Sequence, residues 1–361
     1  MGAKTIASIV GARPQFIKAA PVSRALAGSF REILIHTGQH YDYGMSDVFF
    51  EEIEMRPPDY NLGVGGGSHG EQTGRMLIEI EKILDSVKPD CVLVYGDTNS
   101  TLAGALAAAK SQIPLAHVEA GLRSYNRAMP EEINRVLTDH ISTLLFCPTD
   151  AAIENLAKEG ITNGVHRVGD VMYDALLHNL AIARKRSTIL KSLGLEKGTY
   201  ALATVHRAAN ADDLARLGAL LNAFGSLSSR VVFPVHPRTR QMIQEAGLTV
   251  AGNVMMVEPV GHFDILILQE NANCILTDSG GMQKEAYLLG VRCITLREET
   301  EWVETVNVGW NKLAGVEASA ICIAYESWHP AGERPALYGD GFAAQEICQV
   351  LKRELSWTEF P

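Results

Sequence analysis

Carboxylic acids gather in three short segments between residues 97 and 132 of this 361-residue chain. Asp97 and Glu119 each follow a short apolar run, and Glu131 and Glu132 open a stretch with helical periodicity. In a parallel α/β sheet, residues directly after such runs lie at the carboxyl ends of strands, where ligands bind. Carboxylates held close together acquire different pKa values, so one can act as an acid and another as a base. The three segments therefore indicate proton transfer.

A loop with two cations follows the first predicted strand. In Gly11-Ala12-Arg13-Pro14-Gln15-Phe16-Ile17-Lys18 a helix begins, and Arg13 and Lys18 could both face an anion at its N-terminus. The alternative is a strand–helix turn with two solvated cations. The loop is neither a Walker A sequence nor G-x-G-x-x-G, which argues against bound ATP or NAD.

Small residues start a helix in the second half of the chain. In Ser279-Gly280-Gly281, backbone N–H groups could approach a phosphate closely, and Glu285 could accept hydrogen bonds from ribose hydroxyls. The alternative is an ordinary helix N-cap formed by Asp278 or Ser279. Two glycines after the cap lower helix propensity, which favours the functional interpretation.

Two histidines follow successive predicted strands, each beside an arginine. His206-Arg207 and His236-Pro237-Arg238 suit phosphate binding or proton transfer, and the alternative is a pair of polar loops. Their spacing matches no zinc motif, and no acidic cluster resembles an EF-hand loop. The sequence therefore predicts no required metal.

Short apolar strands alternate with helical stretches along almost the whole chain, which predicts doubly wound parallel sheets. The predicted strands are Thr5–Val10, Ile33–His36, Cys91–Tyr95, Leu115–Val118, Leu144–Cys147, Tyr200–Val205, Arg230–Val235, Val254–Val257, Asn273–Thr277 and Arg292–Leu296. The predicted helices are Phe16–Leu26, Arg75–Ser86, Thr101–Lys110, Glu131–Thr138, Asp212–Phe224, Thr239–Ala246, Phe263–Glu270 and Met282–Leu289.

The pattern resets once, which predicts two Rossmann-like domains with a cleft between them. We expect the first domain over residues 1–175 and the second over residues 176–341, which the family resemblance described below implies to be the UDP-binding domain. The last helix, in residues 342–361, is expected to pack back on the first domain.

Composition narrows the class of protein. The formal net charge of −10 argues against non-specific binding to nucleic acid or acidic membranes. No apolar run approaches about 18 residues, so no membrane span is expected. The six cysteines form no C-x-x-C pair and indicate reduced core thiols in a cytoplasmic protein.

In combination, the motifs resemble the non-hydrolysing UDP-N-acetylglucosamine 2-epimerases over nearly the whole chain. The resemblance implies the GT-B architecture, a UDP-sugar substrate, a homodimer, and no nicotinamide or metal cofactor. It also implies removal of the C2 proton while UDP leaves C1, a 2-acetamidoglycal intermediate, and re-addition of UDP with C2 inverted. The motifs are GARPQFIK, TGQH, YGDTNST, HVEAGLRS, PEEINR, TVHR, PVHPR and TDSGGMQKEA.

The resemblance also implies roles for individual residues. The catalytic set would be Asp97, Glu119, Glu131 and His206, with the carboxylates sharing proton transfer and His206 supporting departure of UDP. The substrate-binding set would be Arg13, Lys18, Arg207, His236, Ser279, Gly280, Gly281 and Glu285.

Two segments depart from the common family pattern. Ala209 stands where the family commonly has Glu, which puts an acid at that position in doubt. Thr300-Glu301-Trp302-Val303-Glu304 replaces the usual Thr-Glu-Arg-Pro-Glu. With Gly309-Trp310-Asn311 and the Gly65–Gly70 loop, it resembles the branch acting on UDP-2,3-diacetamido-2,3-dideoxy-glucuronic acid. That branch, which feeds synthesis of surface polysaccharides such as O-antigen, is favoured over plain UDP-N-acetylglucosamine. A GT-B glycosyltransferase is a more distant alternative.

Two further segments suggest regulation or closure. Some family members bind a second substrate molecule near segments that correspond to Gln39, His40 and Arg75, so these residues are regulatory candidates. Gly65–Gly70 predicts a flexible loop that closes on ligand, or a simple connector.

Overall fold

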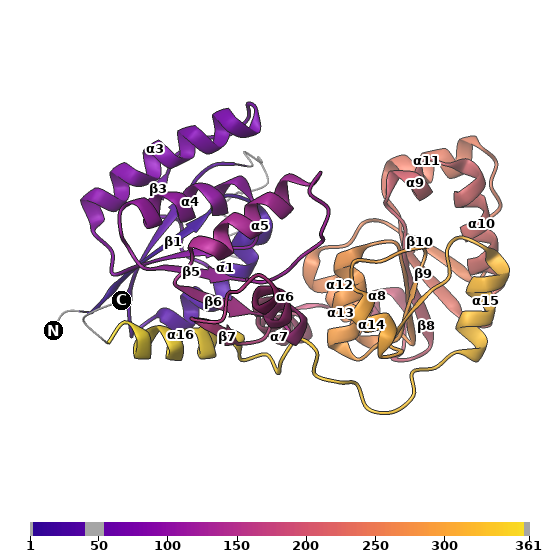
Figure 1. Ribbon diagram of the computed structural model, residues 1–361. Helices are drawn as coiled ribbons and strands as arrows, with labels where there is room; N and C mark the ends of the chain where they lie inside the picture. The colour runs from indigo at the N-terminus through magenta and orange to yellow at the C-terminus, as the bar shows by residue number, and fades with distance from the viewer. Residues whose placement is uncertain (1–2, 40–53, 357–361) are drawn as a thin grey trace. The chain divides into compact units, whose positions relative to one another are not determined.

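The chain folds into two compact α/β units, each built on its own parallel sheet (Figure 1). The computed structural model describes residues 3–39 and 54–356. One unit comprises residues 1–177 and 337–361, and the other comprises residues 178–336. The chain passes from the first unit into the second after Leu177 and returns after Ala336, where the sequence predicted boundaries after residues 175 and 341.

A seven-stranded parallel sheet forms the centre of the first unit, in the order β3-β2-β1-β4-β5-β6-β7. Buried apolar side chains cover both of its faces. The strands are β1 (Thr5–Val10), β2 (Arg31–His36), β3 (Tyr60–Asn61), β4 (Cys91–Tyr95), β5 (Leu115–Val118), β6 (Leu144–Cys147) and β7 (Val165–Arg167). The helices are α1 (Arg13–Leu26), α3 (His69–Val87), α4 (Asn99–Lys110), α5 (Pro130–Ile141), α6 (Asp150–Lys158), α16 (Ala343–Glu354) and the start of α7 (Val171–Arg186), which continues into the second unit.

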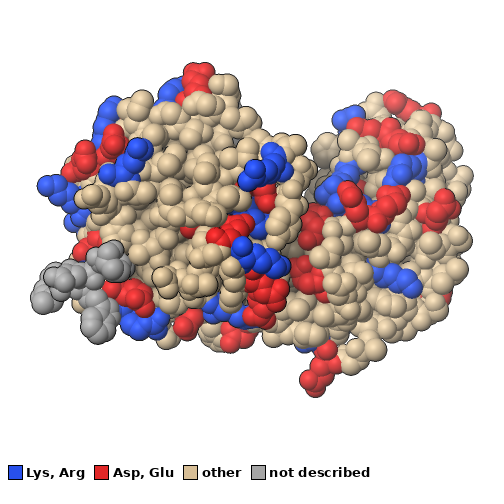
Figure 2. All heavy atoms as spheres, in the orientation of Figure 1, with Lys and Arg blue, Asp and Glu red and all other residues tan. Residues whose placement is uncertain are grey.

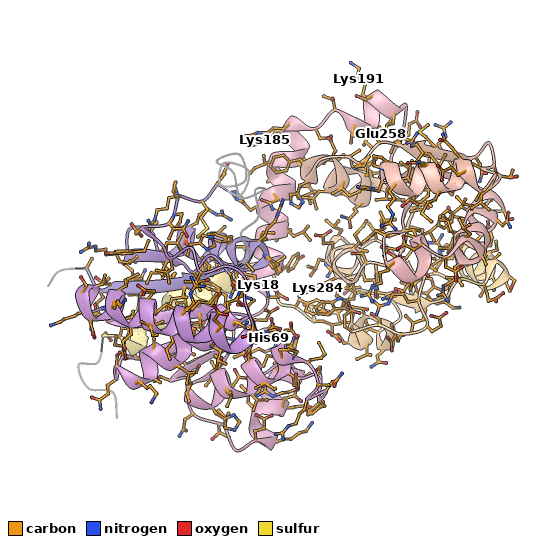
Figure 3. The ribbon with its side chains drawn as sticks, turned by 90° about the horizontal axis from the view of Figure 1, so that it is seen from above. Lys18, His69, Lys185, Lys191, Glu258 and Lys284 are labelled. Carbon is orange, nitrogen blue, oxygen red and sulfur yellow. The ribbon has the colours of Figure 1, made fainter. Side chains whose placement is uncertain are left out.

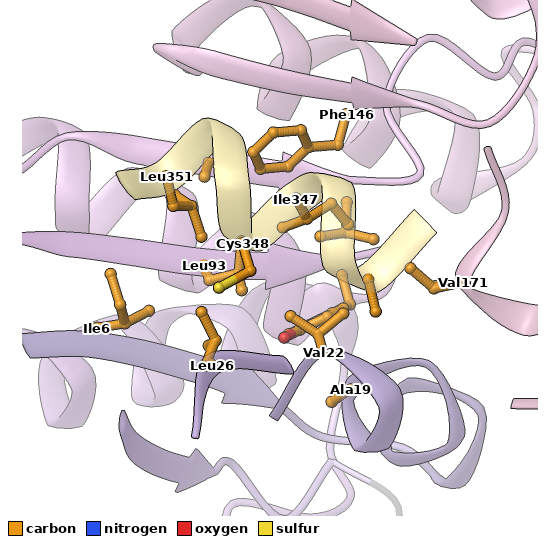
Figure 4. Packing of buried hydrophobic residues seen from close by; sticks show 14 of the residues in the cluster. Ile6, Ala19, Val22, Leu26, Leu93, Phe146, Val171, Ile347, Cys348 and Leu351 are labelled. Atoms are coloured by element: carbon orange, nitrogen blue, oxygen red, sulfur yellow. The ribbon is translucent and has the colours of Figure 1, made fainter. Parts of the chain in front are cut away.

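The last helix, α16, completes the core of the first unit. Its apolar residues Ile347, Cys348 and Leu351 share one buried cluster with Val22 and Leu26 of α1 (Figure 4). The start of α16 is fixed by Asp174 of α7, whose carboxylate accepts hydrogen bonds from the backbone N–H groups of residues 343 and 344. A carboxylate from elsewhere in the chain thus caps the free N–H groups of this helix end.

A six-stranded parallel sheet forms the second unit, in the order β10-β9-β8-β11-β12-β13. Apolar clusters again cover both faces. The strands are β8 (Tyr200–Thr204), β9 (Arg230–Pro234), β10 (Val254–Val257), β11 (Cys274–Thr277), β12 (Cys293–Thr295) and β13 (Asn311–Leu313). The helices are α8 (Ile189–Leu193), α9 (Ala208–Ala211), α10 (Leu214–Gly225), α11 (Pro237–Glu245), α12 (His262–Asn271), α13 (Gly280–Leu289), α14 (Val303–Asn307) and α15 (Ala318–Ser327).

The strand order of each sheet reverses once. The first sheet reverses between β1 and β4, and the second between β8 and β11. Such a reversal opens a crevice at the carboxyl ends of the strands, because the flanking connections run to opposite sides of the sheet. Each unit therefore has one topologically favoured place for a ligand.

Candidate active site

The reversal point of the first sheet gathers acidic and basic side chains. Lys18 lies on α1, which follows β1, and Asp97 directly follows the short turn after β4. Glu119 follows the neighbouring strand β5, and Glu131 lies in the first turn of α5. These candidates thus come from consecutive loops at the same edge of one sheet.

Lys18 and Glu119 form an ion pair in which both side chains are largely buried. Burial alone would lower the pKa of Lys18, but the adjacent Glu119 carboxylate, with Asp97 farther off, holds this pKa above its ordinary value. Lys18 can be located in Figure 3, together with His69 of the same unit. Lys18, which the sequence predicted to face an anionic ligand, therefore pairs with the candidate catalytic carboxylate of Glu119.

The backbone at Glu119 is unusual. Its φ of 75° lies in the left-handed region, which a residue with a Cβ rarely adopts. The turn before Asp97 is equally constrained, since a Cβ on Gly96 would lie 3.3 Å from both Glu119 Oε2 and Lys18 Nζ. Strained backbone of this kind concentrates at functional sites.

Arg135, which the sequence analysis did not single out, holds Asp97 in place. Its guanidinium pairs with the Asp97 carboxylate and, at 3.0 Å, with Glu132. Burial alone would lower the pKa of Arg135, but these two carboxylates hold it above its ordinary value. Glu131 lies four residues before Arg135, so both project from the same face of α5. The sequence feature that could have identified Arg135 is its position at the end of the PEEINR motif.

Glu132, the neighbour of Glu131, has a structural role. Its buried carboxylate accepts hydrogen bonds from the backbone N–H groups of Ser124 and Tyr125, at 2.9 and 2.8 Å. These bonds, with Arg135, hold the pKa of Glu132 below its ordinary value, although burial acts the other way. Glu132 therefore fixes the loop that precedes α5.

The reversal point of the second sheet brings His206 and Ser279 together through Asp278. The fully buried Asp278 carboxylate accepts hydrogen bonds from the backbone N–H groups of His206 and Arg207, at 3.2 and 3.1 Å. Its Oδ1 also lies 3.5 Å from Nδ1 of His206. Of the two caps considered from sequence, Ser279 is the N-cap of α13. Asp278 instead joins the loop after β8 to the loop after β11.

The side chain of Glu301 lies beside the first turn of α13. A Cβ on Gly280 would lie 2.1 Å from Oε1 of Glu301, so a larger residue there would displace that side chain. Arg297 donates to that carboxylate at 2.8 Å, and Arg207 lies 3.6 Å from it. The indole of Trp302 donates to the Gly280 carbonyl at 2.8 Å. Negative charge is favourable at this helix end because its free N–H groups point toward it.

Two further binding candidates, Glu285 and His236, lie in the second unit. Glu285 on α13 accepts a hydrogen bond of 2.8 Å from Gln269, and burial raises the pKa of Glu285 despite that bond. His236 caps α11, where its Nδ1 accepts from the backbone N–H of Arg238 at 3.3 Å. Both therefore lie on the elements that the sequence predicted.

The regulatory candidates are only partly described. Gln39 accepts hydrogen bonds from the backbone N–H and hydroxyl of Ser100, at 2.9 and 2.6 Å. Arg75 is an exposed residue of α3, 3.8 Å from Glu71, and His40 lies outside the described residues.

The prediction that residues 65–70 form a loop is wrong for the last two residues, which belong to α3. Ser68 caps α3 and accepts from the N–H of Glu71, so His69 and Gly70 are helical. His69 is held further by a 3.1 Å hydrogen bond to Asn99. The cap overrides the low helix propensity of the glycines.

Residues 3–39 and 54–356 contain neither a candidate metal cluster nor a candidate membrane-spanning helix. No group of three or more His, Cys, Asp or Glu side chains there could hold a metal ion. No helix in these ranges combines the length and apolar character needed to cross a membrane.

Residues 24–352 match the family model described as UDP-N-acetylglucosamine 2-epimerase. The chain belongs to this family. It is 53% identical to a UDP-N-acetylglucosamine 2-epimerase homolog of Methanococcus maripaludis, over 96% of this chain and 99% of that protein. It is 46% identical to the UDP-2,3-diacetamido-2,3-dideoxy-D-glucuronate 2-epimerase of Pseudomonas aeruginosa, over the same shares.

Solved structures agree with the family assignment. The UDP-GlcNAc 2-epimerase of Methanocaldococcus jannaschii matches with a TM-score of 0.87 and 44% identity, over 97% of this chain and 99% of that one. The calicheamicin glycosyltransferase CalG4 matches with a TM-score of 0.57 at 13% identity, over 99% of this chain and 95% of that one, which shows a shared GT-B-like fold alone. The chain is thus a UDP-sugar 2-epimerase of GT-B-like fold, and such enzymes are isomerases.

Proposed function

We propose that this enzyme inverts C2 of a UDP-2-acetamido sugar from the gluco to the manno configuration without hydrolysis. The observation that supports the proposal is that Asp97 and Glu119 follow the adjacent strands β4 and β5 and pair with Arg135 and Lys18, while Glu131 lies on the helix that carries Arg135. These different cationic partners give Asp97 and Glu119 different environments. Different environments are what an acid and a base in the same site require.

The chemistry balances with these groups alone. One carboxylate takes the C2 proton, the C1–O bond breaks toward UDP, and a C1=C2 double bond forms. UDP then returns to C1 while a second carboxylate delivers a proton to the opposite face of C2. His206, anchored on Asp278, would support departure of UDP. Elimination and re-addition of UDP require no transient oxidation of the sugar, so we propose no nicotinamide, and the family resemblance implies no metal.

The second unit would bind UDP. Ser279, Gly280 and Gly281 begin α13, a helix end where negative charge is stabilised. Glu285 would accept from the ribose hydroxyls and His236 would bind the diphosphate, with Arg13, Lys18 and Arg207 as further diphosphate candidates.

The favoured substrate is UDP-2,3-diacetamido-2,3-dideoxy-D-glucuronic acid, and the alternative is UDP-N-acetylglucosamine. Overall identity does not separate the two, since relatives of both kinds are 46% identical to this chain. The preference rests on Trp302, which stands where plain UDP-N-acetylglucosamine enzymes usually have Arg. Trp302 binds the Gly280 carbonyl and lies under the Lys284 ammonium, 4.4 Å from the ring centre. The product would feed surface-polysaccharide synthesis, such as O-antigen, in the cytoplasm.

Turnover of the two UDP-sugars in parallel tests this proposal. The expected result is a manno-configured UDP-sugar in both tubes, with a higher kcat/KM for the diacetamido uronate. Trp302→Arg should move the ratio of the two kcat/KM values toward UDP-N-acetylglucosamine. Equal ratios in the variant and the wild type would remove Trp302 as the basis for the preference. Free sugar and UDP as the only products would contradict the non-hydrolysing reaction.

We also propose a homodimer formed through α5. Met129, Ile133 and Leu137 recur every four residues there and expose 37%, 48% and 46% of their surface. Ile133 and Leu137 border a cavity of about 750 Å³ that Val136 and Arg127 also line. Figure 2 shows a broad surface without charged groups over α4 and α5. Its rim carries both arginine and glutamate, which suits contact with a second copy of the same surface.

A further inference from the structure

A buried cluster of four ionisable side chains lies beneath the loops that carry Asp97 and Glu119. Its members come from β5, the loop after β5, the last turn of α5 and the end of α6, and all lie in the first unit. Three of the four side chains expose no more than 1% of their surface. They are His117, Arg123, Asp139 and Glu159.

His117 has an acceptor at each ring nitrogen. Nδ1 lies 2.7 Å from Oδ1 of Asp139, and Nε2 lies 2.7 Å from the Gly96 carbonyl oxygen. A carbonyl oxygen can only accept, so Nε2 must donate. Oδ2 of Asp139 accepts from Arg123 and from the Gly121 N–H, at 2.7 and 3.1 Å. An ionised Asp139 leaves Nδ1 as the donor of the remaining bond, so both ring nitrogens carry a proton.

With Asp139 ionised, the charges in this cluster balance only if His117 is an imidazolium. Arg123 donates twice to Glu159, at 2.7 and 2.8 Å, and pairs with Asp139. Burial alone would raise the pKa of Asp139, but His117 and Arg123 hold that pKa below its ordinary value. Two carboxylates then face two cations. A neutral His117 would leave one negative charge unbalanced in the interior, which is costly.

The cluster forms hydrogen bonds with the backbones of both loops that carry the acidic residues. Gly96, whose carbonyl accepts from His117, is the residue before Asp97. Gly121, whose N–H donates to Asp139, lies two residues after Glu119. A Cβ on Gly121 would lie 2.4 Å from the Ala152 carbonyl oxygen, so this loop has no room to shift toward α6. One rigid cluster therefore sets the positions of two candidate catalytic carboxylates relative to each other.

We infer that His117 is a doubly protonated positioning residue, and that the His117–Asp139 pair fixes the spacing of Asp97 and Glu119. This inference rests on the proposed function for its effect on turnover. Neither side chain touches the open edge of the sheet, because both are completely buried. Their effect on the reaction is geometric, and a displacement of about 1 Å in such a site costs on the order of 100-fold in rate.

The protonation state can be measured without any turnover. The chain contains 11 histidines, and ¹⁵N-histidine labelling with long-range ¹H–¹⁵N correlation spectra distinguishes imidazolium from either neutral tautomer. The His117 signals are identified by their loss in His117→Gln. The expected result at pH 7 is two protonated ring nitrogens that persist on addition of UDP. One protonated and one bare nitrogen would overturn the inference.

The positioning effect is measured in His117→Gln against the control His166→Gln. His166 lies on β7 of the same sheet, outside both acidic loops. His117→Gln should lower kcat about 100-fold while the Kd of UDP stays within twofold, and a circular dichroism spectrum matching the wild type reports that the variant is folded. His166→Gln should retain wild-type kcat. Wild-type kcat in His117→Gln would overturn the inference, whereas an inactive wild type would instead overturn the proposed function.

Discussion

The ammonium of Lys18 contacts the carboxylate of Glu119 in a largely buried pair at the carboxyl edge of the first sheet. A lysine at the start of α1 would ordinarily be assigned to the substrate diphosphate. Its pairing with Glu119 gives it a second role, which is to set the charge around a carboxylate that must exchange a proton. The two roles predict different kinetic effects when Lys18 is replaced.

Lys18→Met should lower kcat about 100-fold, because a group that tunes a proton-transferring carboxylate acts on the chemical step. Arg13→Met, at the start of the same helix, serves as the comparison and should mainly raise KM. Steady-state kinetics of both variants separate these effects. If Lys18→Met changes only KM, the lysine serves the diphosphate and its pairing with Glu119 has no catalytic consequence.

Glu119→Gln should reduce turnover at least ~100-fold, the lower range for general acid–base groups. Glutamine keeps the size of the side chain, so the loop and its left-handed residue should be preserved. The exposed Glu154 on α6 provides the control, and Glu154→Gln should be fully active. Wild-type turnover in Glu119→Gln would remove Glu119 from the catalytic set.

Asp174 makes the attachment of α16 dependent on pH. Burial raises the pKa of Asp174 to about 6, so the folded state holds a proton that the unfolded chain releases near pH 4. The free energy of opening should therefore fall as pH rises from about 4 to 6, by at most about 3 kcal/mol, and then level off. Hydrogen exchange of residues 343–354, corrected for the intrinsic effect of pH, measures this change.

The matched variant for this effect is Asp174→Asn. It has no titrating group at this position, so exchange in α16 should lose its dependence on pH between 4 and 6. An unchanged dependence in Asp174→Asn would assign the effect to another residue.

The α5 surface should determine the oligomeric state. Ile133→Asp combined with Leu137→Asp places two charges on the proposed interface and should convert the dimer to a monomer of 39.2 kDa. Ile323 of α15 is 63% exposed, and Ile323→Asp should leave the dimer intact. Light scattering gives the masses. A wild-type monomer, or a double variant that stays dimeric, would contradict the proposed interface.

The fold was predictable because the signal lies in local periodicity. Apolar runs such as Cys91–Tyr95 and Cys274–Thr277 are buried strands ending in polar or small residues, and alternation with helices implies parallel sheets. Strand β3, with two residues, and β7, with three, are too short to show a period. Helix α6 was also missed, although Thr149 caps it.

The candidate site was predictable as a set of positions, but not as a set of contacts. Strand ends located Asp97, Glu119 and His206, because parallel strands bring their carboxyl ends together. The partners of these residues depend on side-chain directions across distant elements. Neither the Arg135–Asp97 pair nor the bridging role of Asp278 leaves a periodic signal, since each joins residues 38 or more positions apart.

Deuterium incorporation at C2 tests the central claim most directly. The protein is incubated in D₂O with each of the two UDP-sugars, and the C2 and anomeric protons are followed by NMR. Loss of the C2 proton signal together with a manno-configured UDP-sugar is the predicted result. Formation of the manno product with its C2 proton retained, or no exchange with either sugar, would contradict proton transfer at C2 by these carboxylates.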